Sequence, residues 1–277
     1  MRDDPELFQL IEHVEGRHAT VDDLSLAHDA SYIDAVSAII ARLQEPANLT
    51  PDTVISPGSF AAATAAVGCV LDGVDRALDG RSLRSLCGVR PPGHHALRDE
   101  AMGFCLFGNV AIAAHYARQR RGLERVLIVD WDVHHGNGTQ ALVEHDPGIH
   151  FVSMHQWPWY PGTGAAEDRG PHQSVWNVPM PPGLAAGVYV DALLEAVDAA
   201  ATGFSPDLVL ISAGFDSLAG DPLGGFTLEV SDIVQLTREL VRRAEGWCQG
   251  RIVSALEGGY VPERVGAACV AHLRALA

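Results

Sequence analysis

The chain has 277 residues, with 19 Lys and Arg against 35 Asp and Glu, which gives a formal net charge of −16. Such an acidic surface repels the phosphates of DNA and RNA, so direct nucleic-acid binding is not expected. Hydrophobic residues make up 47% of the chain and charged residues 19%, which excludes intrinsic disorder and predicts a large buried core.

The cysteines and the N-terminal segment bear on the cellular compartment. The five cysteines are odd in number and contain no CxxC pair, so neither a disulfide framework nor a zinc knuckle is supported. The first residues, MRDDPELFQL, lack the basic start and apolar run of a signal peptide. No apolar stretch reaches membrane-spanning length. These features predict a cytoplasmic protein without a membrane segment.

Short apolar stretches alternate with longer helical patterns along the chain. Val, Ile and Leu on consecutive positions are typical of strands covered on both faces, as in a parallel sheet. The alternation predicts one α/β domain with a parallel β-sheet flanked by helices on both faces. In chain order we expect a helix over 58–79, a strand over 85–89, a helix over 105–120, strands over 125–131 and 149–155, a helix over 185–202, a strand over 208–213, a helix over 228–247, a strand over 251–256 and a helix from Pro262. Segment 42–57 is the least regular.

Unusual polar residues follow four of the expected strands. The strand over 85–89 leads into RPPGHHA, and the one over 125–131 leads into the run DWDVHHGNGTQ. The strand over 208–213 precedes GFDS, and the strand over 251–256 precedes EGGY. Because ligand sites in open parallel sheets lie beyond the carboxyl ends of the strands, these segments predict one shared site.

Asp132, His134 and Asp216 are candidate metal ligands. Asp132 and His134 are two residues apart, so on a strand-like segment both side chains point the same way. Asp216, at the end of another strand, supplies a third donor, and three protein ligands are typical of a catalytic Zn²⁺ site. On spacing alone, a capping Asp and a core His are the more common explanation of this pattern.

The pair His94 and His95 and the residue Tyr260 are candidate catalytic groups. Two adjacent imidazoles could deprotonate a water and protonate a leaving group. Tyr260, after two glycines, could donate a hydrogen bond to an oxyanion. Taken separately, the histidines fit a solvated turn and the tyrosine fits the start of the last helix.

Six motifs, in this order, resemble the zinc-dependent histone deacetylase family: RPPGHHA, GFCLFGNVAIAA, VDWDVHHGNGTQ, SAGFDS, GDPLGGF and LEGGY. The similarity is greatest to its class II-like branch and to bacterial histone deacetylase-like amidohydrolases, and it extends from about Ala27 to the C-terminus. It implies an arginase/deacetylase-like fold and removal of acetyl or other short acyl groups from the lysine side-chain amine or a related acylated amine. It also implies that Asp132, His134 and Asp216 bind Zn²⁺.

The same resemblance implies the catalytic roles. His95 would be the general base, and Tyr260 would polarise the scissile carbonyl. Asp130 matches the carboxylate partner of His94, whereas Asn137 matches the partner of His95. A carboxylate favours imidazolium more than a neutral amide does, so the expected base stays neutral near pH 7.

Four further residues match substrate-binding positions of the family. Phe104 and Tyr160 match the aromatic walls of the acyl-lysine tunnel, and Gly258 lies in the LEGGY motif. Leu223 occupies a rim position where the acetylpolyamine-preferring branch carries Glu. The absence of that charge favours acyl-lysine or a related acylated amine as substrate.

Family members also bind potassium beside the zinc. The matching groups, partly through backbone carbonyls, are Asp130, Asp132, His134, Ser153 and Met154.

The chain departs from the family pattern in two places. It starts after the family's usual first strand and His-Pro loop, so we expect residues 1–277 to be a deacetylase-like catalytic domain without that strand. Gly108 stands where Asn is common.

Leu218, two residues beyond Asp216, argues against the two-metal arginase arrangement. The alternatives are an acetylpolyamine or other small-molecule amide deacetylase and a non-catalytic zinc-fold binding protein; the oligomeric state is left open.

Overall fold

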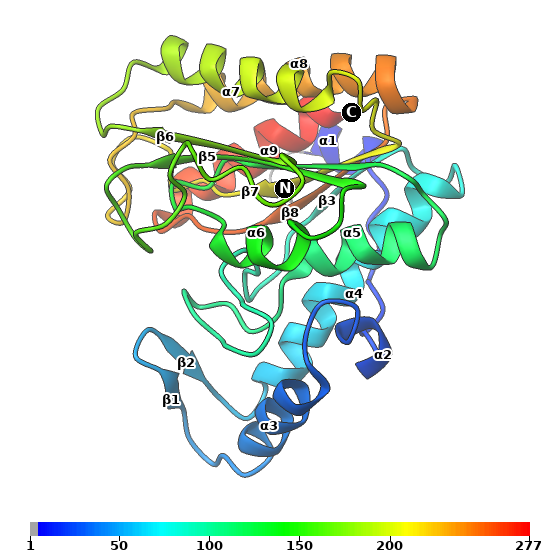
Figure 1. The fold of residues 1–277 in the computed structure, drawn as a ribbon, viewed down its shortest axis with the longest axis vertical. Helices are drawn as coiled ribbons and strands as arrows, with labels where there is room; N and C mark the ends of the chain where they lie inside the picture. The colour runs from blue at the N-terminus through cyan, green and yellow to red at the C-terminus, as the bar shows by residue number, and fades with distance from the viewer. Residues whose placement is uncertain (1–4) are drawn as a thin grey trace.

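A six-stranded, wholly parallel sheet forms the centre of the computed structural model, which describes residues 5–277 (Figure 1). The strand order is β3-β8-β7-β4-β5-β6. The strands are β3 (Arg84–Cys87), β4 (Val126–Asp130), β5 (Ile149–Gln156), β6 (Val175–Met180), β7 (Leu208–Ala213) and β8 (Ile252–Leu256). Adjacent residues of β4 face opposite layers, since Val126 and Ile128 join one buried apolar cluster and Leu127 and Val129 the other. This explains why the strand is apolar without alternation.

Helices cover both faces of the sheet, as the sequence predicts (Figure 1). One layer holds α7 (Ala186–Ala201), α8 (Val230–Cys248) and α9 (Pro262–Leu276). The opposite layer holds α4 (Ser59–Leu78), α5 (Asn109–Gln119) and α6 (Asn137–Val143). The predicted α/β fold is therefore confirmed. Within residues 5–277, no helix combines the length and the apolar composition needed to cross a membrane.

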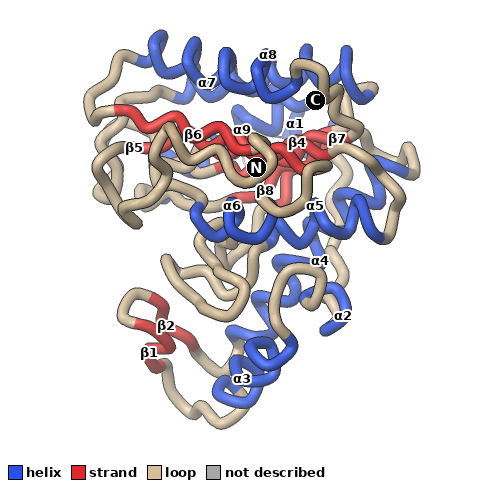
Figure 2. Tube along the Cα trace, in the orientation of Figure 1, coloured by secondary structure: helices blue, strands red, loops and turns tan. Residues whose placement is uncertain are grey.

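Several elements were not predicted. The N-terminal part contains α1 (Pro5–Leu10), α2 (Val21–Leu24) and α3 (Ala30–Ile40). Segment 42–57 contains a small antiparallel hairpin of β1 (Ala47–Thr50) and β2 (Thr53–Ile55), which extends beyond the α4–α5 layer (Figure 2). The edge strand β6 carries Pro179 and is only partly buried, so it lacks the continuous apolar run of the inner strands.

The expected strands lie within about two residues of the observed ones, but one expected helix begins later. The helix expected over 105–120 starts at Asn109. Before it, Gly103 and Phe104 have φ angles of 55° and 69°, which an α-helix excludes. The apolar run GFCLF is thus a loop that leads toward the candidate site.

Candidate active site

A cavity of about 250 Å³ lies at the carboxyl ends of neighbouring strands. Strands β3, β8, β7 and β4 are consecutive in the sheet, so the polar segments that follow them meet at one edge. The cavity is lined by both tandem histidines and by groups from the loops after β4, β5, β7 and β8. The sequence-predicted lining residues that the structure brings together here are His94, His95, Phe104, His134, Tyr160, Leu223, Gly258 and Tyr260.

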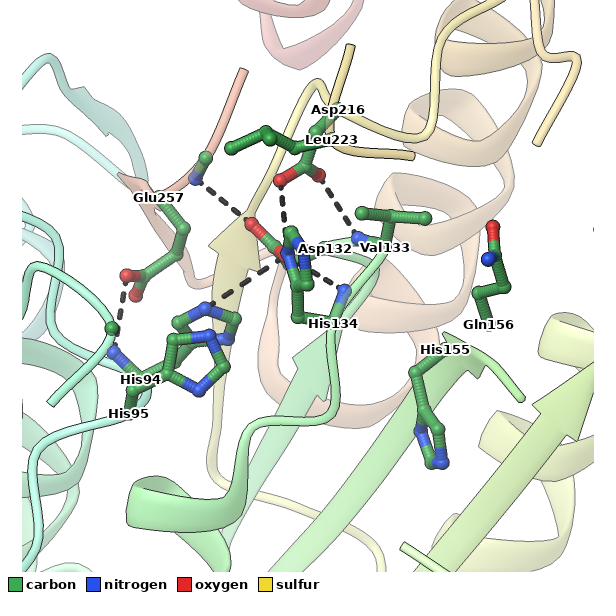
Figure 3. Close-up of polar contacts among 12 residues, drawn as sticks. His94, His95, Asp132, Val133, His134, His155, Gln156, Asp216, Leu223 and Glu257 are labelled. Atoms are coloured by element: carbon green, nitrogen blue, oxygen red, sulfur yellow. Dashed lines mark hydrogen bonds and ion pairs between the residues drawn. The ribbon is translucent and has the colours of Figure 1, made fainter. Parts of the chain in front are cut away.

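Asp132, His134 and Asp216 lie together beside this cavity, which His134 lines, and all three are buried (Figure 3). One ligand atom from each lies within 4.8 Å of the others, the only such His/Cys/Asp/Glu cluster among the described residues. His134 Nδ1 is 2.9 Å from Asp132 Oδ1 and 3.3 Å from Asp216 Oδ2. The latter contact lacks hydrogen-bond geometry, so Asp216 Oδ2 is buried without a hydrogen-bond partner. Two carboxylates and one imidazole, with Asp216 Oδ2 buried and without a hydrogen-bond partner, fit a divalent metal ion.

Backbone groups hold these carboxylates in place. The Val133 N–H donates to Asp216 Oδ1 at 2.9 Å, and the Gly258 N–H donates to Asp132 Oδ2 at 2.8 Å. A Cβ at Gly258 would lie 2.1 Å from Asp216 Oδ2, and one at Gly214 would lie 2.3 Å from Asp132 Oδ2. Both glycines are therefore needed for the close approach of the backbone to the carboxylates. Burial and the charge of Asp132 raise the pKa of Asp216 to about 7, as expected for two carboxylates in one buried site.

The tandem histidines have different partners. His94 Nδ1 donates to Asp130 Oδ2 at 3.0 Å, and His95 Nδ1 donates to Asn137 Oδ1 at 2.7 Å. Although burial lowers the pKa of His94, the charges of Asp132 and Asp130 raise it well above the ordinary value. Burial and the adjacent His94 lower the pKa of His95 well below the ordinary value. One imidazole is therefore held charged and its neighbour neutral.

Tyr260 and Phe104 form one wall of the cavity. Their ring centroids are 6.1 Å apart in an edge-to-face arrangement. The Tyr260 N–H donates to Asp221 Oδ2 at 2.7 Å, which fixes the backbone from which the ring projects. Burial, together with Asp132 and Asp216, raises the pKa of the Tyr260 phenol, so its hydroxyl stays protonated and available as a donor.

Tyr160 also lines the cavity, with its ring edge-to-face against His95 at 5.1 Å and against His134 at 5.9 Å. Next to it, the Trp159 indole N–H donates to the Leu223 carbonyl at 2.8 Å. Leu223 is 36% exposed and belongs to the mouth of the cavity. This part of the mouth, formed by Trp159, Tyr160 and Leu223, is therefore aromatic and apolar.

Asp130, Ser153 and Met154 lie beneath the cavity and are fully buried. Asp130 of β4 pairs in register with Ser153 of β5, and Asp130 Oδ1 accepts the Asp132 N–H at 3.0 Å. Ser153 Oγ is 3.1 Å from His155 Nδ1. Asp130 and Ser153 therefore form polar groups behind the metal-ligand candidates, whereas the Met154 side chain packs in the apolar core.

The sequence reasoning missed three residues at this site. Glu257 is buried, and its Oε2 accepts the N–H of Gly93 at 2.7 Å and that of His94 at 3.2 Å (Figure 3). Asp221 accepts the backbone N–H groups of Tyr260 and Leu223, and Asp52 of the hairpin lines the mouth. Glu257 could have been found because it directly follows an apolar strand in EGGY. Asp52 carries no such signal.

Comparison with known proteins agrees with this geometry. The profile of the Histone deacetylase domain matches residues 1–276. Histone deacetylase 10, chloroplastic, of Oryza sativa subsp. japonica is 36% identical over 279 residues, with 96% of this chain and 63% of that protein covered. Histone deacetylase-like amidohydrolase of Pseudomonas aeruginosa is 37% identical over 246 residues, with 87% of this chain and 64% of that protein covered.

The architecture matches as well. The crystal structure of the HDA15 HD domain superposes with a TM-score of 0.89 at 38% identity and covers 95% of this chain and 74% of that one. The chain spans 63% and 64% of the rice and Pseudomonas proteins, so their whole-protein properties are not transferred by similarity alone. The profile match, the shared sheet and the sequence identity establish that the chain belongs to the histone deacetylase family.

Proposed function

We propose that this family member is a zinc-dependent amidohydrolase that removes acetyl or other short acyl groups from the lysine side-chain amine or a related acylated amine. The observation that carries the proposal is the position of two histidines with unequal partners beside the Asp132–His134–Asp216 cluster. His94 is backed by a carboxylate and His95 by an amide. Hydrolysis of an amide needs both a base and an acid, and this pair supplies one of each.

Asp132, His134 and Asp216 would hold the zinc ion. Two carboxylate oxygens and one imidazole nitrogen are donors that Zn²⁺ accepts, and three protein ligands leave a position open. When bound, zinc supplies Lewis-acid polarisation of a carbonyl and lowers the pKa of a water molecule.

The remaining chemistry falls to the protein's own groups. His95 accepts a proton from the attacking water, since its amide partner leaves the imidazole neutral. Tyr260 donates its hydroxyl proton in a hydrogen bond to the carbonyl oxygen as that oxygen gains negative charge. His94, kept protonated by Asp130, delivers a proton to the departing amine.

The walls and mouth favour an acyl-lysine. Phe104 and Tyr160 would enclose its four-carbon stem between aromatic faces, and Gly258 would leave room at the inner end. Leu223 at the mouth presents no charge to a second ammonium group. Asp52 also lines the mouth, but its carboxylate already accepts hydrogen bonds from Thr50, Thr53 and Tyr160, so the apolar Leu223 leaves an acetylpolyamine the less favoured substrate.

We further propose a monovalent cation, potassium, beside the zinc. Its ligands would be Asp130 and Ser153, with backbone carbonyls of Asp132, His134 and Met154. Two buried carboxylates two residues apart are costly to leave without positive charge. Replacing potassium with a bulky organic cation at constant ionic strength should lower the Tm or the activity; no change in either would contradict this site.

The main proposal is tested by turnover of a panel of acyl-lysine peptides and acetylpolyamines with zinc-replete protein. The wild-type protein should hydrolyse at least one acyl-lysine peptide, and His95→Ala should lose most of that activity. His145→Ala, on the surface, is the matched control and should keep it. Equal rates for the wild-type protein and a folded His95→Ala variant would overturn the proposal.

A further inference from the structure

A second cavity, of about 590 Å³, lies away from the active site beside the edge strand β3. Its walls come from the segment after α1 and from α4, β3 and α9. Three of the chain's five cysteines line it: Cys69, Cys87 and Cys269. All three thiols are free.

Two of these cysteines are in direct contact. The Cys87 thiol, at the end of β3, donates to the backbone carbonyl of Cys69 on α4, with Sγ 3.6 Å from the oxygen. A Cβ at Gly73, one helical turn further along α4, would lie only 3.4 Å from Cys87 Sγ. The thiol of Cys87 therefore rests on the surface of α4 beside Cys69.

The pair is chemically asymmetric. Cys69 is half-buried and faces the cavity, whereas Cys87 is 3% exposed. The neighbouring Cys87 thiol lowers the pKa of the Cys69 thiol, against the opposing effect of burial. The same contact, together with burial, raises the pKa of Cys87. Cys69 thus has more thiolate character and better access, which are the two properties that govern thiol oxidation.

A metal site at this pair is not supported. Among the described residues, neither thiol belongs to a group of three His, Cys, Asp or Glu with ligand atoms close enough to hold an ion. Two adjacent thiols without a third ligand are suited to disulfide chemistry, which needs only the pair and an oxidant.

We propose that Cys69 and Cys87 form an oxidation-sensitive dithiol that a hydroperoxide entering this cavity converts to a disulfide. The Cys69 thiolate attacks one peroxide oxygen, the O–O bond breaks, and an alcohol or water leaves after taking up a proton. Cys69 is then a sulfenic acid. Cys87 loses its proton and attacks the Cys69 sulfur, the S–S bond forms, and the hydroxyl group leaves as water. The two thiols lose two electrons, and the peroxide gains them.

The disulfide would link α4 to the end of β3, a few residues before the tandem histidines. The chain continues from Cys87 through a short loop to Gly93 and His94, whose N–H groups bind Glu257. The dithiol is thus connected to the tandem histidines by six intervening residues, 88–93, although it lies outside their cavity.

The test is chemical mapping of the folded protein after exposure to hydrogen peroxide. The protein is then unfolded in denaturant with an alkylating agent that blocks all free thiols, and the digest is examined by mass spectrometry without reduction. We expect a cross-linked peptide pair containing Cys69 and Cys87, lighter by two hydrogens than the separate peptides and released by dithiothreitol. The number of alkylated thiols should fall from all five cysteines to three (5 − 2).

Two variants sharpen the result. Cys69→Ser should abolish the cross-link and leave Cys87 alkylatable after unfolding. Cys269→Ser is the matched control, because Cys269 lines the same cavity but burial raises the pKa of its thiol to about 11; it should retain the cross-link. A Cys69–Cys269 cross-link, a cross-link only between separate chains, or overoxidised Cys69 without a cross-link would each overturn the proposal.

Discussion

The Tyr160 hydroxyl donates a hydrogen bond to Asp52 Oδ2 at 2.7 Å, so the loop after β5 and the β1–β2 hairpin meet across the mouth of the cavity. Asp52 Oδ1 accepts the hydroxyls of Thr50 and Thr53, at 3.0 Å and 2.9 Å. Asp52 is thereby fixed within its own hairpin. One wall of the proposed tunnel is held by a segment more than a hundred residues away in the chain.

Tyr160→Phe should therefore affect substrate binding more than chemistry. The ring remains, but the hydrogen bond to Asp52 is lost. The contact between the hairpin and the loop after β5 is then weaker by about 0.5–1.5 kcal/mol. We expect KM for an acyl-lysine peptide to rise severalfold with kcat nearly unchanged. Tyr116→Phe loses a hydrogen bond to Asp75 between α5 and α4, neither of which lines the cavity, and should lower Tm without raising KM. A Tyr160→Phe effect confined to kcat would contradict this role.

Asp216→Ala should lose the proposed zinc ion. Elemental analysis of purified wild-type protein should give about one zinc per chain, because the described residues contain one cluster of suitable ligands. The variant retains only two of those ligands. Asp198→Ala, which removes a surface carboxylate paired with Arg243, should keep the full content. Undiminished zinc in Asp216→Ala would refute the ligand assignment.

Tyr260→Phe should lower kcat by about 10²–10³, the typical loss when one oxyanion donor is removed. The ring packing against Phe104 is preserved, and the backbone N–H can still bind Asp221. Zinc content and Tm should therefore remain close to wild type. Steady-state kinetics at saturating substrate would measure the effect, and an unchanged kcat would exclude Tyr260 from the reaction.

Leu223→Glu should shift the preference toward acetylpolyamines. The new carboxylate at the mouth would attract a second ammonium group, and this attraction should weaken as salt rises. The ratio of kcat/KM for an acetylpolyamine to that for an acetyl-lysine peptide should increase. If the wild-type protein already prefers acetylpolyamines by about tenfold, equal to about 1.4 kcal/mol, then the argument from Leu223 fails.

The free energy of unfolding should fall as the pH drops below about 6.5. His272 is buried between the hydroxyls of Thr237 and Ser254, and burial lowers its pKa from 6.5 to about 3. Burial also lowers the pKa of His28 to about 4. The unfolded chain therefore binds protons that the folded chain does not, and stability is lost from about pH 6.5 down toward pH 4.

Urea unfolding at pH 7 and pH 5 would measure this loss. Each such histidine contributes up to about 1.4 kcal/mol per pH unit in that window. His272→Gln should unfold more readily at both pH values but depend less on pH, whereas the exposed His145→Gln should behave like wild type. A pH dependence unaltered in His272→Gln would contradict the assignment.

The central sheet could be predicted because strands buried on both faces are apolar at consecutive positions. Strands β4 and β7 are apolar at nearly every position and end in polar motifs. The hairpin could not be predicted, since its exposed Val54 and partly buried neighbours show no extended pattern. Likewise, the positive φ of Phe104 is imposed by its surroundings, including the hydrogen bond from its N–H to the Thr53 hydroxyl.

The candidate site, too, could be predicted from the sequence only in part. The residues at strand ends could be placed on one edge because parallel strands bring their carboxyl ends together. Asp52 reaches the cavity through tertiary packing of a distant hairpin, which no local pattern records. The hydrogen bonds of Glu257 likewise depend on how the loop before His94 folds back over β8.

Glu257 also accepts a hydrogen bond from the Ser212 hydroxyl of β7 at 3.0 Å through its second oxygen. One carboxyl group therefore links the sheet to the loop that carries His94 and His95, called the histidine loop below. The mouth is built differently, from Asp52, Trp159 and Leu223 on three separate loops. Substitutions confined to Asp52, Trp159 and Leu223 can therefore change the mouth while Asp216 and Asp221, on the same loop as Leu223, are left in place. For protein engineering, the mouth is the place to randomise when a new acylated amine is sought, and the histidine loop is the place to leave intact.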